Sequence, residues 1–228
     1  MAKRTKSSNQ WMTRQKKDVF ARRAASEGLV SRAHFKLEQM DQRFRLLQRG
    51  MVVLELGAAP GGWTRYVADK IADKTDRGRV VAVDFRPITA PASVVVIEGE
   101  AGTTQIDAQI ARELATATGS EPRCDLVISD MAPNITGIRA ADQAASMHLA
   151  ELAAEAAAMY LKRGGHLVVK MFQGEGVDEW LSEQRQRFEK CQFAKPKASR
   201  SESREVFAVC QRFKGGRIAQ PDTDNQST

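Results

Sequence analysis

Apolar residues along the chain fall into short continuous runs that alternate with longer stretches of mixed character. The runs, rich in valine and isoleucine, predict strands at residues 51–56, 79–85, 94–97, 124–130, 166–172, 192–194 and 205–210. The intervening stretches predict helices at residues 31–44, 63–72, 105–117, 142–161 and 177–188. Strands that alternate with helices form parallel sheets covered on both faces. We therefore expect a Rossmann-like α/β fold.

The last two predicted strands depart from this alternation. Residues 205–210 follow residues 192–194 with no helix between them. Such a connection favours an antiparallel pair, because parallel neighbours need a longer crossover. The expected sheet thus has seven strands, mostly parallel, with an antiparallel hairpin at one edge.

Five of the predicted strands end in charged side chains. These are Glu55 before a glycine turn, Asp84, Glu98 with Glu100, Asp130 and Lys170. Ligands of such sheets bind beyond the carboxyl ends of the strands. One charged strand end is a weak signal, but five together predict a single charged cleft.

Lys170 is the most unusual of these residues, because it lies in an apolar strand expected to be covered on both faces. A buried lysine is paired or functional, unless its side chain reaches solvent at the strand end. Asp130 is followed by Pro133, which keeps the chain extended after the strand, although a turn-forming aspartate would give the same pattern. The pattern favours placing both side chains at the cleft.

The turn Gly57-Ala-Ala-Pro-Gly-Gly62 joins a predicted strand to a helix. Its small residues allow a ligand to approach the backbone, and Asp84 is placed to accept hydrogen bonds from a ribose diol. Ala59 and Pro60 disfavour a dinucleotide pyrophosphate. The turn therefore indicates an adenosine-containing ligand or, alternatively, a tight turn that binds nothing. Trp63 would either contact that ligand or belong to the core.

The net charge of +7 belongs to the N-terminal end of the chain. Residues 1–23 contain eight basic residues and one acidic residue, whereas the remainder has 27 of each. A basic arm on a neutral body indicates a polyanionic partner, or else a solvated tail. We expect a flexible basic arm at residues 1–30, one domain at residues 31–213 and a disordered polar tail at residues 214–228.

Cysteine usage and hydropathy disfavour other classes of protein. The three cysteines are scattered and form no Cys-x-x-Cys pair, which argues against a disulfide framework and a zinc site. No apolar run is long enough to cross a bilayer. We therefore expect a cytoplasmic monomer that uses neither a metal nor a membrane.

Five motifs occur in order along the chain. They are Ser31-Arg-Ala-His-Phe-Lys36, Gly57-Ala-Ala-Pro-Gly-Gly-Trp63, Ser129-Asp-Met-Ala-Pro-Asn134, Val168-Val-Lys-Met-Phe-Gln-Gly-Glu-Gly176 and Ser203-Arg-Glu-Val206. Together they resemble the FtsJ/RrmJ family of bacterial large-subunit ribosomal RNA 2′-O-methyltransferases, over residues 31–213. The resemblance implies a class I methyltransferase fold and S-adenosyl-L-methionine as the cofactor.

The resemblance also implies the roles of individual residues. The Lys-Asp-Lys-Glu catalytic tetrad of the family falls on Lys36, Asp130, Lys170 and Glu205. The cofactor contacts of the family fall on Gly61, Trp63, Asp84, Glu100 and Asp130. The implied substrate is a uridine in the A loop of 23S ribosomal RNA, methylated within the large ribosomal subunit.

The tetrad suggests a mechanism for removing the hydroxyl proton. We expect Lys170 to act as general base or to stabilise the developing alkoxide, and the sequence leaves its protonation state open. Asp130 would orient Lys170, Lys36 would hold the ribose or its phosphate, and Glu205 would tether one lysine.

Two residues depart from the family pattern. Glu100 stands where an aspartate is usual, which alters the reach toward the adenine, and His34 stands where a tryptophan is frequent. Related enzymes that methylate tRNA or mitochondrial ribosomal RNA would share the tetrad, so these substrates stay open. The intact tetrad disfavours a non-catalytic assembly factor, and Ala59 disfavours a nicotinamide oxidoreductase.

Overall fold

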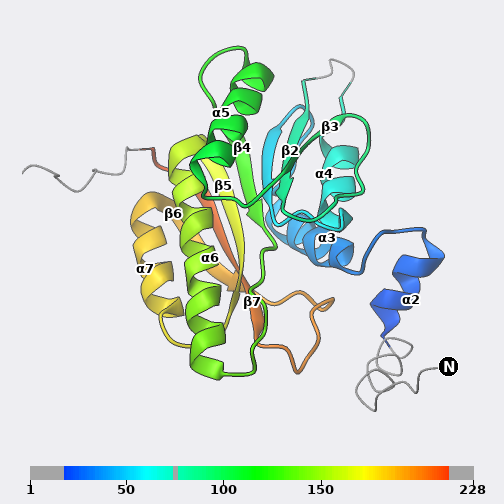
Figure 1. Ribbon diagram of the computed structural model, residues 1–228, viewed down its shortest axis with the longest axis vertical. Coiled ribbons are helices and arrows are strands. Elements are labelled where there is room, and N and C mark those ends of the chain that lie inside the picture. The colour runs from blue at the N-terminus through cyan, green and yellow to red at the C-terminus, as the bar shows by residue number, and fades with distance from the viewer. Residues whose placement is uncertain (1–17, 74–76, 216–228) are drawn as a thin grey trace, which may run out of the picture.

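Seven strands form one sheet in the order β3-β2-β1-β4-β5-β7-β6 (Figure 1). The computed structural model describes residues 18–73 and 77–215. The strands are β1 (Val52–Leu56), β2 (Arg79–Asp84), β3 (Val94–Glu98), β4 (Cys124–Ser129), β5 (Leu161–Phe172), β6 (Phe188–Ala194) and β7 (Glu205–Phe213). Strands β1 to β5 are paired in parallel, whereas β7 is antiparallel to both β5 and β6. The predicted mixed sheet with an antiparallel edge hairpin is confirmed.

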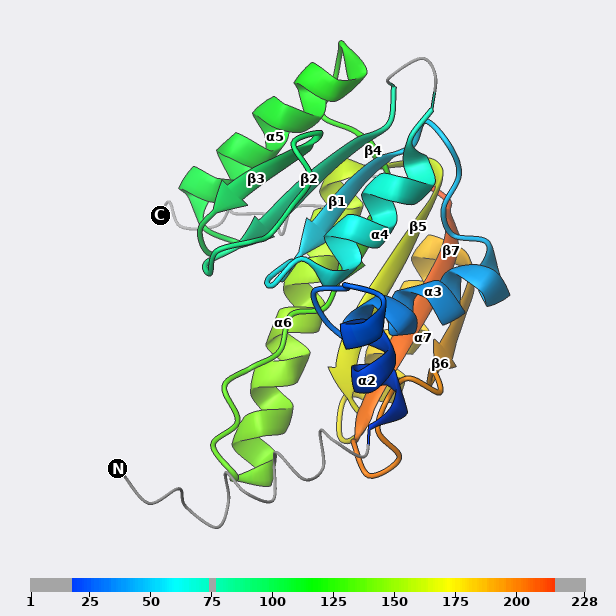
Figure 2. The ribbon, with the colours of Figure 1, turned by 90° about the vertical axis from the view of Figure 1, so that its right-hand side faces the viewer.

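Helices cover both faces of this sheet. The helices α3 (Ala33–Phe44) and α4 (Gly62–Ile71) lie on one face, and α5 (Thr104–Thr118), α6 (Arg139–Tyr160) and α7 (Val177–Arg187) lie on the other (Figure 2). Successive residues of β1 alternate between the two cores: Leu54 packs in the core on the α5–α7 side, and Val53 packs in the core on the α3–α4 side. Strands buried on both faces in this way have the continuous apolar sequences from which they were predicted.

A further helix, α2 (Val19–Ser26), corrects the predicted flexible arm. Asp18 caps this helix, with its Oδ1 accepting hydrogen bonds from the backbone N–H groups of Phe20 and Ala21 at 3.1 Å each. Ala24 packs in a small core with Phe35 and Ala198. The folded body therefore includes residues 18–30 of the predicted arm, and residues 1–17 lie outside the described residues.

Several other boundaries differ from the sequence prediction: β6 begins at Phe188 instead of residue 192, and β7 ends at Phe213 instead of residue 210. β5 begins at Leu161 instead of residue 166, because an irregularity in register lets Leu161 pair with Cys124 before His166 pairs with Leu126. Of the predicted tail, only residues 214 and 215 are described, and the rest lies outside the described residues. No helix in the described part of the chain is long and apolar enough to span a membrane.

Asp41 joins α3 to α4 through a buried carboxylate. Its Oδ1 accepts hydrogen bonds from the backbone N–H groups of Leu46 and Leu47, both at 2.9 Å, and its Oδ2 accepts one from the Tyr66 hydroxyl at 2.9 Å. Three donors would lose their acceptor together if this carboxylate were removed.

We predict that Asp41→Ala lowers the free energy of unfolding by about 3 kcal/mol, because buried donors left without an acceptor are costly. Urea denaturation monitored by circular dichroism measures this change. Gln42→Ala, at the exposed neighbouring position on α3, is the control and should differ little from the wild type. Equal stabilities of the two variants would contradict the role assigned to Asp41.

Candidate active site

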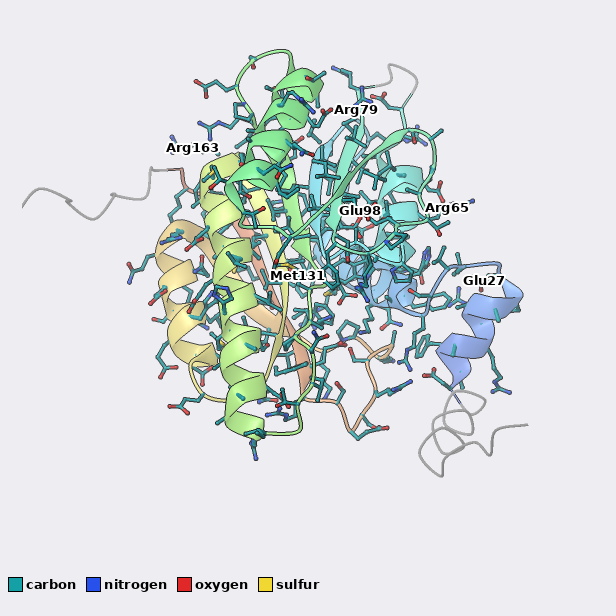
Figure 3. All side chains as sticks on the ribbon, in the orientation of Figure 1. Glu27, Arg65, Arg79, Glu98, Met131 and Arg163 are labelled. Carbon is teal, nitrogen blue, oxygen red and sulfur yellow. The ribbon has the colours of Figure 1, made fainter. Side chains whose placement is uncertain are left out.

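The carboxyl ends of the parallel strands meet at one edge of the sheet. In Figure 3, Glu98 and Met131 mark the ends of β3 and β4 near the middle of the molecule, whereas Arg79 and Arg163 mark the opposite ends of β2 and β5. The charged strand ends predicted from the sequence thus lie along one edge, as the parallel arrangement requires.

The glycine turn after β1 is tied to the neighbouring strand ends. The backbone N–H of Gly57 donates to the carbonyl of Val83 at 2.9 Å. The N–H of Ala59 donates to Asp84 Oδ2, also at 2.9 Å. Gly57 has a φ of +74°, and a Cβ there would lie 2.6 Å from the backbone nitrogen of Met131, so a side chain at this position is excluded. The turn therefore holds the ends of β1, β2 and β4 in fixed relation.

Asp84 is a buried carboxylate at the end of β2, only 4% exposed. Besides the N–H of Ala59, it accepts hydrogen bonds from the backbone and the guanidinium of Arg86, at 2.9 to 3.3 Å. Burial would raise the pKa of Asp84, but these donors outweigh burial and hold the pKa below its usual value. Asp84 is therefore an ionised acceptor beside the turn. Phe85, the next residue, exposes an aromatic ring to solvent.

Glu55 lies beneath the same turn and is 1% exposed. Its Oε2 atom is buried without a hydrogen-bond partner among the described residues. Burial, reinforced by the negative charges of Asp130 and Asp84, raises the pKa of Glu55 to about 8. The side chain is therefore a neutral acid at pH 7, in contrast to the ionised Asp84.

Lys170 is buried on β5, as predicted, and is paired with Asp130 at the end of the adjacent strand β4. Its Nζ donates a hydrogen bond to the backbone carbonyl of Asp130 at 2.5 Å and lies 2.9 Å from Asp130 Oδ1. The geometry toward Oδ1 is that of an ion pair without an aligned hydrogen bond, so this buried oxygen retains accepting capacity. Two tetrad residues thus form one unit on neighbouring strands.

Lys36 and Glu205 form the second unit. Lys36 projects from α3, and its Nζ lies 2.7 Å from Glu205 at the start of β7. Ser199 donates a hydrogen bond from its Oγ to Glu205 Oε1 at 2.8 Å. Burial would raise the pKa of Glu205, but Lys36, Ser199 and the charge of Lys170 together lower it. Glu205 is therefore an ionised partner of Lys36.

The two units lie on the same face of the sheet. Glu205 is paired with Phe172 in the antiparallel β5–β7 ladder, and Lys170 is paired with Phe207. Glu205 and Lys170 are therefore diagonal neighbours. Lys36 Nζ lies 5.6 Å from the centre of the Phe207 ring, on that same face. The fold brings together all four residues of the predicted tetrad.

The predicted cofactor contacts are less uniform in their surroundings. Gly61 has a φ of +109°, and a Cβ there would lie 2.1 Å from the carbonyl oxygen of Thr89. Trp63 is 2% exposed, and its indole N–H donates to the carbonyl of Ala33 at 2.8 Å, so its ring belongs to the core. Glu100 is exposed in the connection after β3. Gly61 and Glu100 thus lie beyond the strand ends, while Trp63 reaches the turn only with its backbone.

His34, the other departure from the family pattern, is half-buried. Its ring contacts Phe35 and Tyr66 edge to face, at 5.4 and 5.0 Å between ring centres. Burial lowers the pKa of His34. The residue therefore packs α3 against α4 as a neutral ring.

Three residues of this region were not predicted as site residues. Glu55 was recognised only as a charged strand end, although its place in an apolar strand is the same signal that singled out Lys170. Arg86 and Ser199 carry no local sequence signal, because their roles depend on partners supplied by the folded chain.

The charges of this edge are divided into two halves. The acidic half, at the ends of β1, β2 and β4, contains Asp84, Asp130 and the neutral acid Glu55; the other half contains Lys36 and Lys170, each ion-paired with a carboxylate. The Asp84 carboxylate and the buried Asp130 oxygen without a hydrogen-bond partner suit a cationic ligand such as a sulfonium with an amino group. The residues therefore fit the implied cofactor, with the two lysines beside it.

Strand order, the antiparallel β7 between β5 and β6, and the charged carboxyl edge define a class I methyltransferase architecture. The model of the FtsJ-like methyltransferases matches residues 29–213. The chain belongs to the FtsJ-like methyltransferase family.

Relatives extend over nearly the whole chain. The ribosomal RNA large subunit methyltransferase E of Stutzerimonas stutzeri is 44% identical over 213 residues, which cover 93% of this chain and 100% of that protein. The protein of the same name from Xanthomonas oryzae pv. oryzae is 46% identical over 211 residues, covering 92% and 97%. A crystal structure of a Plasmodium falciparum ribosomal RNA methyltransferase aligns with a TM-score of 0.70 at 24% identity, over 82% of this chain and 99% of that one, and supports the fold.

We predict that Glu55→Gln changes how stability depends on pH. The folded pKa of about 8 lies above the ordinary value of 4.5, so between these limits the folded state binds a proton that the unfolded state has lost. Wild-type stability therefore falls as pH rises through this window, by up to about 1.4 kcal/mol per pH unit from this residue alone. The glutamine of the variant cannot ionise, so the variant does not lose stability in this way as the pH rises.

Urea unfolding of both proteins at pH 5, 6, 7 and 8 measures the difference in their free energies of unfolding. The contributions of all other titrating groups are the same in both proteins and cancel in this difference. The stability of Glu55→Gln relative to the wild type should rise steadily with pH. A difference that stays constant would show that Glu55 is already ionised in the folded protein.

Proposed function

We propose that the chain transfers a methyl group from S-adenosyl-L-methionine to a ribose 2′-hydroxyl of RNA. The proposed target is a uridine in the A loop of 23S ribosomal RNA within the large subunit. The observation that carries the proposal is the convergence of two lysine–carboxylate pairs, Lys170–Asp130 and Lys36–Glu205, beside a glycine turn that is hydrogen-bonded to Asp84. The names of the relatives, which specify the large-subunit ribosomal RNA, support this choice of substrate.

The cofactor would lie against the acidic half of the edge. Its sulfonium supplies an electrophilic methyl group. We infer contacts with Gly61, Asp84, Glu100 and Asp130, and with Trp63 through the backbone of the first turn of α4, where N–H groups lack intrahelical partners. The exposed ring of Phe85 next to Asp84 offers an apolar surface for the adenine. Arg86 would give up part of its contact with Asp84 to a ribose diol.

Lys170 is proposed to act on the 2′-oxygen. An ammonium group has three donors, and Asp130 occupies two sides of this one, its carbonyl by a hydrogen bond and its Oδ1 by an ion pair. The third donor can hold the 2′-oxygen and stabilise the negative charge that develops as the hydroxyl proton leaves to solvent. Asp130 thereby fixes the direction of Lys170. The role proposed for Lys170 is thus to stabilise the alkoxide rather than to act as a general base.

Lys36 is proposed to hold the ribose or its phosphate. Glu205 and Ser199 fix the Lys36 side chain from the opposite strand. Positioning of this kind lowers the barrier because the hydroxyl must lie in line with the methyl group and its leaving group. We infer that the protein acts in the cytoplasm as a monomer on the large subunit.

The substrate assignment is tested with labelled S-adenosyl-L-methionine offered separately to large subunits lacking the modification, naked 23S ribosomal RNA and tRNA. We expect label in the 23S RNA of the subunits, resistant to base treatment as a 2′-O-methylated nucleotide. Label in tRNA but not in subunits would replace the ribosomal substrate by tRNA. No label in any RNA would favour a non-catalytic role.

We predict that Lys170→Ala lowers methyl transfer by about 10²–10³-fold, as expected for loss of a group that stabilises the transition state. The control is Lys162→Ala, which removes a lysine from the same strand that is paired with Asp125 at 3.2 Å at the other end of the sheet. Single-turnover rates and cofactor affinity by calorimetry are the measurements. Near-normal turnover by Lys170→Ala with normal cofactor affinity would remove Lys170 from the mechanism.

A further inference from the structure

Two of the three cysteines face each other across the antiparallel edge of the sheet. Cys191 on β6 is the direct partner of Cys210 on β7, and both side chains pack in the core on the α5–α7 side. The third cysteine, Cys124, lies on β4 and is separated from β7 by β5. All three are free thiols. The pair belongs neither to the tetrad nor to the proposed cofactor site.

The register brings this pair within reach of a disulfide bond. Residues directly opposite in an antiparallel ladder have Cα atoms about 4.5 or 5.5 Å apart. Both separations lie in the range of about 4.4–6.8 Å that disulfide-bonded cysteines adopt. Cys210 donates a hydrogen bond from its thiol to the sulfur of Cys191, so the two side chains point toward each other. A bond between the sulfurs therefore requires little movement of the strands.

The surroundings make Cys191 the more reactive of the two. Cys191 lies on the edge strand of the sheet and is 7% exposed, whereas Cys210 is 0% exposed. The hydrogen bond from Cys210 and the positive charges of Arg185 and Lys214 lower the pKa of Cys191, although burial opposes them. The same hydrogen bond, together with burial, raises the pKa of Cys210. Because the thiolate is the reactive form of cysteine, Cys191 should react first.

The positive charge beside Cys191 is held in place by the end of α7, which lies along β6 (Figure 1). Lys214 Nζ donates hydrogen bonds to the carbonyls of Arg185 and Gln186, at 3.1 Å each. Electropositive surroundings distinguish reactive cysteines from inert buried ones. Cys124 is of the inert kind, since it is 0% exposed and burial raises its pKa.

We propose that Cys191 and Cys210 form a reversible disulfide when the protein meets hydrogen peroxide. The Cys191 thiolate attacks one peroxide oxygen, so that an S–O bond forms, the O–O bond breaks and the hydroxide that leaves takes a proton from solvent. The sulfur of Cys210 then attacks the sulfenic acid on Cys191. The S–S bond forms, and the sulfenic oxygen leaves as water with the thiol proton of Cys210. Two thiols are thereby oxidised and one peroxide is reduced to two waters.

The disulfide would close residues 191–210 into one covalent loop. This loop contains Ser199 and Glu205, which fix the side chain of Lys36. A cross-link restricts the unfolded chain and so stabilises the folded hairpin. Oxidation thus secures the part of the fold that carries Glu205. The inference is independent of the proposed function, because neither RNA nor methyl transfer enters it.

The test treats the folded wild type with hydrogen peroxide, blocks the remaining thiols and maps the peptides by mass spectrometry. We expect a link between Cys191 and Cys210 within one chain, with the blocking group on Cys124 alone. Dithiothreitol should restore all three thiols, and the urea midpoint of the oxidised protein should be higher than that of the reduced protein. Cys124→Ala is the matched control and should form the same link.

Single variants separate the roles of the two thiols. Cys210→Ala leaves Cys191 without its partner, so the sulfenic acid should be captured by dimedone, whereas Cys191→Ala should give neither capture nor a link. Capture in Cys191→Ala but not in Cys210→Ala would overturn the proposed order of reaction. A wild type whose two thiols stay reduced, or become linked only after unfolding in urea, would overturn the inference. These last results come from the wild type, so they decide the question even where a variant fails to fold.

Discussion

The arrangement of the candidate active site depends on keeping one lysine, Lys170, inside the sheet. Lys170 lies on β5 between helices on both faces, where an unpaired ammonium would be strongly destabilising. Asp130 neutralises it from β4, and removing one member of such a pair costs roughly 3–5 kcal/mol. The position of Asp130 depends in turn on the β4–β1 pairing and on the glycine turn. The Lys170–Asp130 pair is thus a structural element of the sheet.

The antiparallel strand β7 adds the second pair. A strand that entered the sheet in parallel would end, rather than begin, at the edge where the ligands bind. Because β7 runs the other way, its first residue, Glu205, lies at the carboxyl edge of β5 and meets Lys36 from α3, 169 positions earlier in the chain. The reversal at the end of the fold therefore brings the Lys36–Glu205 pair beside the Lys170–Asp130 pair.

Much of this arrangement could be predicted from the sequence, for identifiable physical reasons. Buried parallel strands have continuous apolar sequences and end at one edge, so Asp84, Asp130 and Lys170 could be placed from periodicity alone. Lys36 and Glu205 could not, because a lysine on a helix and a glutamate at a strand edge look like ordinary surface residues; only the resemblance joined them. Ser199 and Arg86 went unrecognised because their partners are supplied by the fold.

The N-terminal helix was missed for a different reason. The sequence of α2 mixes alanine with arginine, so its buried face consists of small residues and one aromatic side chain, Phe20. So small an apolar pattern cannot be recognised among the surrounding charged residues. The helix is instead stabilised by tertiary partners such as Arg32 and Ala198. Charge alone described the arm correctly as basic but said nothing of where its folded part begins.

The close approach of Gly57 to Met131 couples the position of the glycine turn to that of the end of β4. Because the backbone of the turn touches the segment next to Asp130 with no intervening side chain, neither can move without displacing the other. A ligand that displaces the turn would therefore also displace the backbone at Met131, one residue from Asp130. Substitution at position 57 is restricted for the same reason: even the Cβ of alanine would clash with the backbone of Met131, the residue after Asp130.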